Sequence, residues 1–224
     1  MKGAVAVFVK TPGLSPVKTR LGATIGHQLA EQFFHLAKAA NEAMLTQAQQ
    51  VFAEQGIELS CYWAVGEVIG VEHPMWLSDT MQRMHTGEGG LGERMHHVYS
   101  TLLEQHDFVV LMGIDSPQNS VENLLDAAEF LVQADSVVIG PALDGGFCVF
   151  GGNVMVELAR WTAVDYSRED TLKNFLLQLS DRPVNYLGAM TDVDTESDLY
   201  RMVDEMEGEL SPEQLALVSF VDRL

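Results

Sequence analysis

The sequence lacks the features that secreted and membrane-spanning proteins need. Only two of its 224 residues are cysteines, and both Cys61 and Cys148 lie in strand-like runs, which favours buried free thiols over a disulfide. No apolar run approaches the roughly 20 residues of a membrane span. Residues 1–9 are too short for a secretory signal and are more typical of a buried strand. We therefore expect a cytoplasmic protein without a membrane span.

Basic residues are also scarce. The chain has 13 Lys and Arg against 32 Asp and Glu, which gives a formal net charge of −19. This charge argues against nucleic acid or an anionic membrane as the main partner. Residues 1–30, however, contain no acidic residue and hold Lys2, Lys10, Lys18 and Arg20. Unless this window arose by chance, it indicates a site for a small anion.

The pattern of apolar residues predicts an α/β fold, organised as one domain over residues 1–224. The expected strands lie at 3–9, 57–65, 108–113, 137–140, 147–151 and 183–187. The expected helices lie at 27–55, 91–106 and 120–133, and three more start near 167, 195 and 211. Residues 10–26 and 66–90 are expected to be irregular. Alternating strands and helices favour a mostly parallel sheet with helices on both faces. The adjacent strands near 140 and 150 indicate one antiparallel excursion.

Aspartates follow several of these strands. Asp115 comes directly after strand 108–113, and Asp144 follows strand 137–140. Ligands bind at the carboxyl ends of the strands in an open α/β sheet, where an aspartate can coordinate a hard cation. Simple turn roles are the alternative for both residues. Asp192 and Asp194 precede a predicted helix and point to the same side if the segment is extended.

The basic segment 10–21 joins the first strand to the first helix, where α/β proteins hold phosphates. Lys18 and Arg20 could neutralise a di- or triphosphate, the arginine by bidentate contact. The segment lacks the Gly-Lys-Ser/Thr ending of a Walker A loop. A structural turn with solvated cations is the alternative.

Residues 87–92 match the G-x-G-x-x-G pattern, but no clean strand precedes them in the predicted structure. We interpret them as a flexible loop before a helix rather than as a dinucleotide fingerprint. His85, His96 and His97 are interpreted as surface or helix residues, because adjacent histidines cannot share one helix face.

Five segments, taken in order, resemble the bacterial DUF2064 group of GT-A-type glycosyltransferase-like proteins, within the nucleotide-diphospho-sugar transferase superfamily. They are residues 8–21, 90–95, 113–117, 140–147 and 192–195. The resemblance implies a Rossmann-like GT-A fold and a divalent metal, Mg²⁺ or Mn²⁺, bound by Asp115 and Asp194. This sequence departs from the group at Tyr166-Ser167, where Trp-Ser is frequent in the group. It also departs at Asp115-Ser116-Pro117, which lacks the second carboxylate of the Asp-x-Asp motif.

The resemblance also implies roles for individual residues. Lys18, Arg20 and Asp115 are expected to be catalytic. The expected substrate contacts are Lys10, Thr11, Pro12, Thr19, Gly92, Arg94, Ser116, Pro117, Asp144, Gly145 and Gly146.

Three functions remain open at this point. The first is a metal-dependent transferase that acts on a nucleotide-sugar, with an acceptor that the sequence does not identify. The second is a nucleotidyltransferase that joins an NTP to a phosphorylated acceptor and releases pyrophosphate. The third is a non-catalytic nucleotide-binding module. The same site geometry suits both transfer reactions, because a fold does not determine a reaction. The missing second carboxylate at Asp115-Ser116-Pro117 is the best support for the non-catalytic module.

Overall fold

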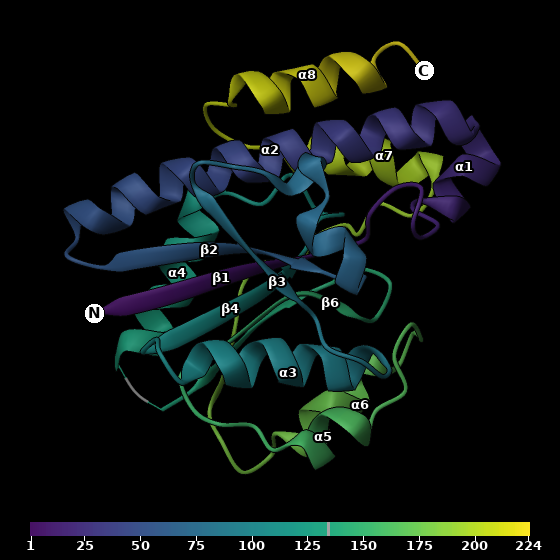
Figure 1. Ribbon diagram of the computed structural model, residues 1–224. Helices are drawn as coiled ribbons and strands as arrows, with labels where there is room; N and C mark the ends of the chain where they lie inside the picture. The colour runs from purple at the N-terminus through teal and green to yellow at the C-terminus, as the bar shows by residue number, and fades with distance from the viewer. Residues whose placement is uncertain (134) are drawn as a thin grey trace.

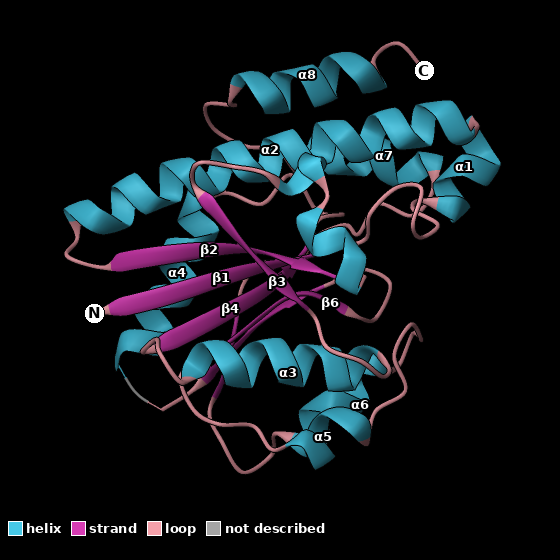
Figure 2. Ribbon diagram, viewed as in Figure 1, coloured by secondary structure: helices cyan, strands magenta, loops and turns pink. Residues whose placement is uncertain are grey.

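The computed structural model describes residues 1–133 and 135–224, and its seven strands form one mixed sheet (Figure 2). In spatial order the strands are β3-β2-β1-β4-β6-β5-β7. Their bounds are β1 Lys2–Val9, β2 Glu58–Val65, β3 Met81–His85, β4 Phe108–Gly113, β5 Val137–Pro141, β6 Phe147–Gly152 and β7 Val184–Tyr186.

Only β6 runs against its neighbours. It pairs antiparallel with both β4 and β5, whereas β1 pairs parallel with β2 and β4, β2 with β3, and β5 with β7. The predicted antiparallel excursion is therefore confirmed. Because β1, β2 and β4 run in one direction, their carboxyl ends meet at one edge of the sheet.

Helices cover both faces of the sheet (Figure 1). The core on one face involves α1, α2, α4, α7 and α8, and the core on the other involves α3, α5 and α6. Their bounds are α1 Thr19–Ile25, α2 His27–Glu54, α3 Leu91–Leu103, α4 Val121–Gln133, α5 Leu158–Thr162, α6 Thr171–Gln178, α7 Glu196–Asp204 and α8 Pro212–Val221. This arrangement confirms the predicted α/β class. None of these described helices combines the length and the apolar composition that a membrane crossing requires.

Strand β1 is buried on both faces of the sheet, between the two layers of helices. Val5, Val7 and Val9 are buried against the α2 face, and Ala4 and Ala6 are buried against the α3 face. A strand buried on both faces has a continuous apolar sequence, which is the pattern of residues 4–9. Both cysteines are buried and free, as expected.

The region 66–90, expected to be irregular, contains two 3₁₀ turns and a strand. The turns are η1 Val68–Glu72 and η2 Pro74–Trp76, and the strand is β3. We missed β3 because it lies at the sheet edge, where Gln82, Arg83 and His85 interrupt the apolar pattern. Strand β3 therefore precedes the Gly-rich segment 87–92, and the prediction that no clean strand does so is wrong.

Other local predictions also need correction. Residues 19–25, expected to be loop, form α1, and the short helix α5 was not foreseen. Helix α4 is capped by Ser120, whose Oγ accepts from the backbone N–H of Asn123.

Gly92 lets α3 approach α5. A Cβ at this position would lie 2.6 Å from the backbone oxygen of Trp161 and 2.9 Å from a ring carbon of Tyr166. Gly92 is buried in this contact and does not line the cavity described below.

We expect Gly92→Ala to lower the free energy of unfolding by about 1–3 kcal/mol, because the added methyl group overpacks the contact between α3 and α5. Chemical denaturation of the two proteins measures the change. Gly188→Ala is the matched control, since a Cβ there meets nothing within 4 Å. Equal stability of Gly92→Ala and wild type would show that α5 moves aside freely.

Candidate active site

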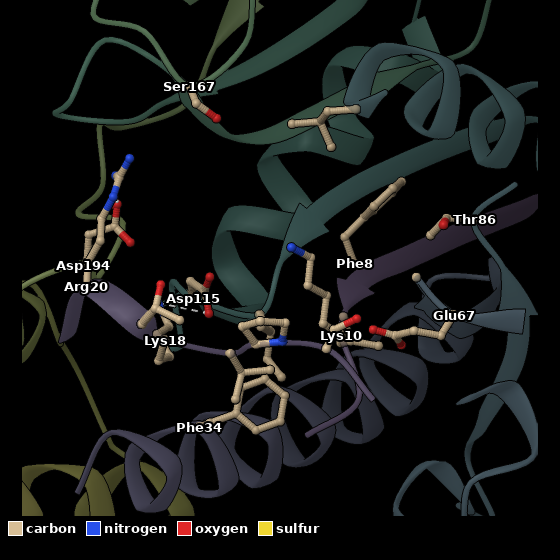
Figure 3. A pocket seen from close by; sticks show the side chains of 18 of the residues that line it. Phe8, Lys10, Lys18, Arg20, Phe34, Glu67, Thr86, Asp115, Ser167 and Asp194 are labelled. Carbon is tan, nitrogen blue, oxygen red and sulfur yellow. Dashed lines mark hydrogen bonds and ion pairs between the residues drawn. The ribbon is translucent and has the colours of Figure 1, made fainter. Parts of the chain in front are cut away.

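A cavity of about 610 Å³ opens at the carboxyl edge of the sheet (Figure 3). Its walls come from segments that follow β1, β2, β3 and β4 and from the segments around residues 167 and 194. Seven predicted site residues line it: Lys10, Lys18, Thr19, Arg20, Arg94, Asp115 and Asp194. The structure thus brings together basic and acidic residues that are up to 184 positions apart, from Lys10 to Asp194.

Lys18 is the most firmly held of these residues. It precedes α1 in a left-handed conformation, with φ 48° and ψ 40°. Its side chain is 3% exposed, and Nζ lies 3.0 Å from Asp115 Oδ1. Nζ also donates a hydrogen bond to the backbone oxygen of Val193. A buried ammonium is costly unless paired, so this network fixes the β1 loop to the end of β4 and to residue 193.

A second ion pair lies nearer the solvent. Arg20 NH1 is 2.6 Å from Asp194 Oδ2, and the two side chains are 68% and 37% exposed. Asp198, and not Asp194, supplies the capping carboxylate of α7, because its Oδ2 accepts from the N–H groups of Thr195 at 2.7 Å and Asp194 at 3.2 Å. The Asp194 carboxylate therefore has no capping role in α7.

Asp192 is a half-buried carboxyl group beside these pairs. Burial, the largest cause, and the negative charges of Asp115, Asp194 and Asp144 together raise its pKa to about 7, while the positive charge of Lys18 opposes the shift. The resemblance does not include Asp192 among the expected metal ligands. The structure shows it to be coupled electrostatically to both predicted metal ligands, consistent with the alternation that points residues 192 and 194 to one side.

Ser116 and Pro117 are predicted contacts that hold neighbouring segments together outside the cavity lining. Ser116 Oγ donates to the backbone oxygen of Thr191 at 3.1 Å, and the backbone oxygen of Pro117 accepts from Gln214. Neither Ser116 nor Pro117 lines the cavity. Ser116 connects the end of β4 to the segment that carries Asp192 and Asp194, and Pro117 connects it to α8.

The turn between β5 and β6 has a similar supporting role. Asp144 Oδ1 accepts from the N–H of Gly146 at 2.9 Å, and its charge contributes to the raised pKa of Asp192. Gly145 has a φ of 92°, and a Cβ there would collide with the backbone oxygen of Glu169. None of the three residues Asp144, Gly145 and Gly146 lines the cavity.

Thr11 and Pro12 are also outside the lining. Thr11 is fully buried, its N–H donates to Glu67 Oε2 at 3.0 Å, and its Oγ1 accepts from Trp76 Nε1 at 3.0 Å. Thr11 therefore fixes the path of the basic loop from within.

Arg94 joins three loops at the rim. It donates to the backbone oxygens of Gly66 at 2.8 Å and Gly89 at 2.9 Å and to Thr86 Oγ1 at 2.9 Å. The ends of β2 and β3 and the Gly-rich segment are therefore held by one guanidinium group.

Sequence reasoning missed several lining residues: Phe8, Phe34, Glu67, Thr86 and Ser167. Ser167 has a φ of 60°, and Lys18 and Ser167 are the two non-glycine residues with positive φ in the described chain. Both line the cavity, and strained backbone concentrates at functional sites. The Tyr166-Ser167 pair that departs from the family pattern was the available signal for this residue.

The carboxylates fit a divalent cation bound in an open site. Among residues 1–133 and 135–224, no cluster of three or more His, Cys, Asp or Glu side chains is arranged as a closed metal site. Asp115 and Asp194 nevertheless face one cavity, and their negative charges add to the effect of burial in raising the pKa of Asp192. Magnesium commonly takes one or two carboxylates, with phosphates and water completing its shell.

We expect the stability of the metal-free protein to depend on pH through Asp192. The carboxyl group of Asp192 has a pKa of about 7 in the folded protein, so it stays protonated where the same group of the unfolded chain, with a pKa near 4, has lost its proton. The free energy of unfolding therefore falls as the pH rises from about 4 to about 7. Relative to wild type, Asp192→Asn should gain about 1–3 kcal/mol between pH 5 and pH 8. Urea denaturation in the presence of a chelator measures the free energy of unfolding at each pH. Asp222→Asn, at an exposed position, is the control. Parallel pH profiles of Asp192→Asn and wild type would contradict the prediction.

Comparison with known proteins gives the family. Residues 36–168 match the family described as "Uncharacterized protein conserved in bacteria (DUF2064)". A search of curated proteins found no match.

Several solved structures share the fold. A protein from Desulfovibrio desulfuricans G20, provisionally named a nucleotide-diphospho-sugar transferase, is 25% identical, with a TM-score of 0.78 over 99% of this chain and 97% of that one. A nucleotidyl transferase from Methanothermobacter thermautotrophicus (Mth528) is 14% identical, with a TM-score of 0.55 over 92% and 96%. CMP:2-keto-3-deoxy-manno-octonic acid synthetase in complex with CTP is 8% identical, with a TM-score of 0.52 over the whole of both chains. The chain therefore belongs to the DUF2064 family and has the fold of the nucleotide-diphospho-sugar transferase and nucleotidyltransferase superfamily.

Proposed function

We propose that this protein is a metal-dependent transferase that binds a nucleotide-sugar in the 610 Å³ cavity and transfers the sugar to an acceptor. The observation that carries the proposal is the pairing of Lys18 with Asp115 and of Arg20 with Asp194 in that one cavity. At the carboxyl edge of the sheet, the two carboxylates can hold a metal ion and the two cations can pair with the phosphate oxygens of a metal-bound diphosphate.

Asp115 and Asp194 would hold Mg²⁺ or Mn²⁺, which when bound supplies positive charge to the diphosphate and stabilises it as a leaving group. Arg20 is exposed and pairs with Asp194 alone among the described residues, so it can exchange the Asp194 carboxylate for a phosphate oxygen. Lys18 is enclosed, and its positive charge stays at the Asp115 end of the cavity. Both cations would stabilise negative charge that develops on the phosphates during transfer.

Lys10 is the remaining basic residue that can contact phosphate directly. It lines the cavity, is exposed, and makes no hydrogen bond or ion pair with any described residue. Figure 3 shows its ammonium group directed into the middle of the cavity, between Asp115 and Phe8. Thr19 lies beside Lys18 and lines the same wall. Arg94, Ser116, Asp144 and the other predicted contacts would act by holding the loops that carry these groups.

Nucleotidyl transfer is the second candidate. It is favoured by the fold shared with Mth528 and with the synthetase bound to CTP. In glycosyl transfer the acceptor displaces a nucleoside diphosphate from the sugar. In nucleotidyl transfer a phosphorylated acceptor attacks the α-phosphate of an NTP and pyrophosphate leaves. Incubation with NTPs and sugar phosphates, followed by assay of pyrophosphate and of nucleoside diphosphate, separates the two reactions. Nucleotide binding with neither product would indicate a non-catalytic binding module.

Asp115→Asn should abolish the Mg²⁺-dependent part of nucleotide binding, because it removes one of the two proposed carboxylate ligands. The thermal stability gained with UDP or GDP, measured with Mg²⁺ and with chelator, reports this loss. Exposed Asp79→Asn is the matched control and should keep the wild-type response. An unchanged metal dependence in Asp115→Asn would contradict the assignment of this ligand.

Lys10→Ala and Arg20→Ala should each weaken binding of a nucleoside diphosphate about tenfold or more, because a charge-assisted hydrogen bond contributes about 1.5–3 kcal/mol. Binding of the nucleoside should change little. Titration calorimetry measures both ligands. Lys2→Ala, at the amino end of β1, is the control. Equal losses for nucleoside and diphosphate would mean that these residues act through the fold rather than on phosphate.

A further inference from the structure

The segment after β2 forms one end of the cavity and is held rigidly. The N–H of Gly66 donates to the backbone oxygen of Val9 at 2.9 Å, and the backbone oxygen of Gly66 accepts from Arg94 at 2.8 Å. Glu67 follows directly and lines the cavity. Its position is therefore fixed by β1 and by α3 before any ligand binds.

The two oxygens of the Glu67 carboxylate differ. Oε2 accepts from the N–H of Thr11 at 3.0 Å. Oε1 is buried and accepts no hydrogen bond from any described residue. A desolvated carboxylate oxygen without a donor is costly, so a ligand that brings a donor to Oε1 gains binding energy. Figure 3 shows the carboxyl group directed toward the stem of Lys10, an exposed side chain that can move aside for such a ligand.

Charge is segregated along the cavity. Figure 3 shows Glu67 on the opposite side from Arg20 and Asp194, with Lys10 between them. A carboxylate repels phosphate and accepts hydrogen bonds only. The Glu67 end therefore suits the uncharged, donor-bearing part of a nucleotide, while the cationic side suits its phosphates.

Resting on the proposed nucleotide site, we infer that Glu67 determines base specificity by accepting hydrogen bonds from N–H donors of the nucleobase. Each carboxylate oxygen accepts up to two hydrogen bonds, so Oε2 keeps a free lone pair beside its bond to Thr11. Among the common bases, guanine presents two adjacent donors, N1–H and the 2-amino group, that match two carboxylate oxygens. Glu67 selects guanine over xanthine, which carries a carbonyl in place of the 2-amino group.

The variant Glu67→Gln tests this selection with little change of shape. The N–H of Thr11 still requires an acceptor, so the amide oxygen takes the place of Oε2 and the NH₂ group takes the place of Oε1. The cavity then offers a donor where wild type offers an acceptor. That donor suits the 2-carbonyl group of xanthine and opposes the 2-amino group of guanine.

The experiment measures dissociation constants of GDP, CDP and xanthosine diphosphate with Mg²⁺ for wild type and Glu67→Gln. We expect wild type to bind GDP about tenfold or more tightly than xanthosine diphosphate, and Glu67→Gln to reduce or reverse that ratio. Glu72→Gln is the control, because Glu72 has an 81% exposed side chain outside the cavity lining and should leave the ratio unchanged. Thermal unfolding without ligand confirms that the variants fold.

Each other outcome overturns the inference in a distinguishable way. If Glu67→Gln weakens all three nucleotides equally, Glu67 contacts ribose or supports the loop, and it does not read the base. If the nucleotides bind but the variant changes nothing, this inference fails while the proposed function stands. If no nucleotide binds to wild type, the proposed function and the inference fail together.

Discussion

The buried contact of the Lys18 ammonium with the Asp115 carboxylate is the interaction on which the candidate site depends. It connects the loop after β1 to the end of β4, and the hydrogen bond from Lys18 to the Val193 carbonyl adds the segment before α7. Removing one partner of such a pair would leave an uncompensated charge in a largely desolvated position. Lys18 has a left-handed backbone conformation, which residues other than glycine rarely adopt and which concentrates at functional sites.

The same contact explains the distribution of charge. Asp115, Asp192 and Asp194 lie close enough for two of them to raise the pKa of the third, and in the ligand-free protein Lys18 and Arg20 offset part of that negative charge. An added divalent cation would offset the remainder, and the arginine, which is exposed, could then turn to phosphate. The ion pairs of the free protein are consistent with a site arranged for a cation and an anion together.

The sequence predicts the strands and the long helices well because their apolar patterns are continuous. Residues 4–9 are buried on both faces, and α2 presents one long apolar stripe. The sequence does not predict β3, because Gln82 and Arg83 interrupt the apolar pattern of this edge strand. It does not predict α5 either, because a five-residue helix has too few turns for a periodic pattern. Local patterns specify the central elements, and tertiary pairing specifies the edges.

For the candidate site, the sequence predicts residues that combine charge with a position after a strand, such as Lys18 and Asp115. It could not predict the geometry of Thr11, Gly92 and Gly145, because their motif positions look like ligand contacts although their backbones pack against other loops. Glu67 carries no sequence signal at all. Its significance arises from one bond to Thr11 and one oxygen without a donor, and both depend on contacts between segments that are 56 residues apart. A motif therefore marks where the chain must be held, whereas the three-dimensional pattern of satisfied and unsatisfied polar atoms indicates where a ligand would gain hydrogen bonds.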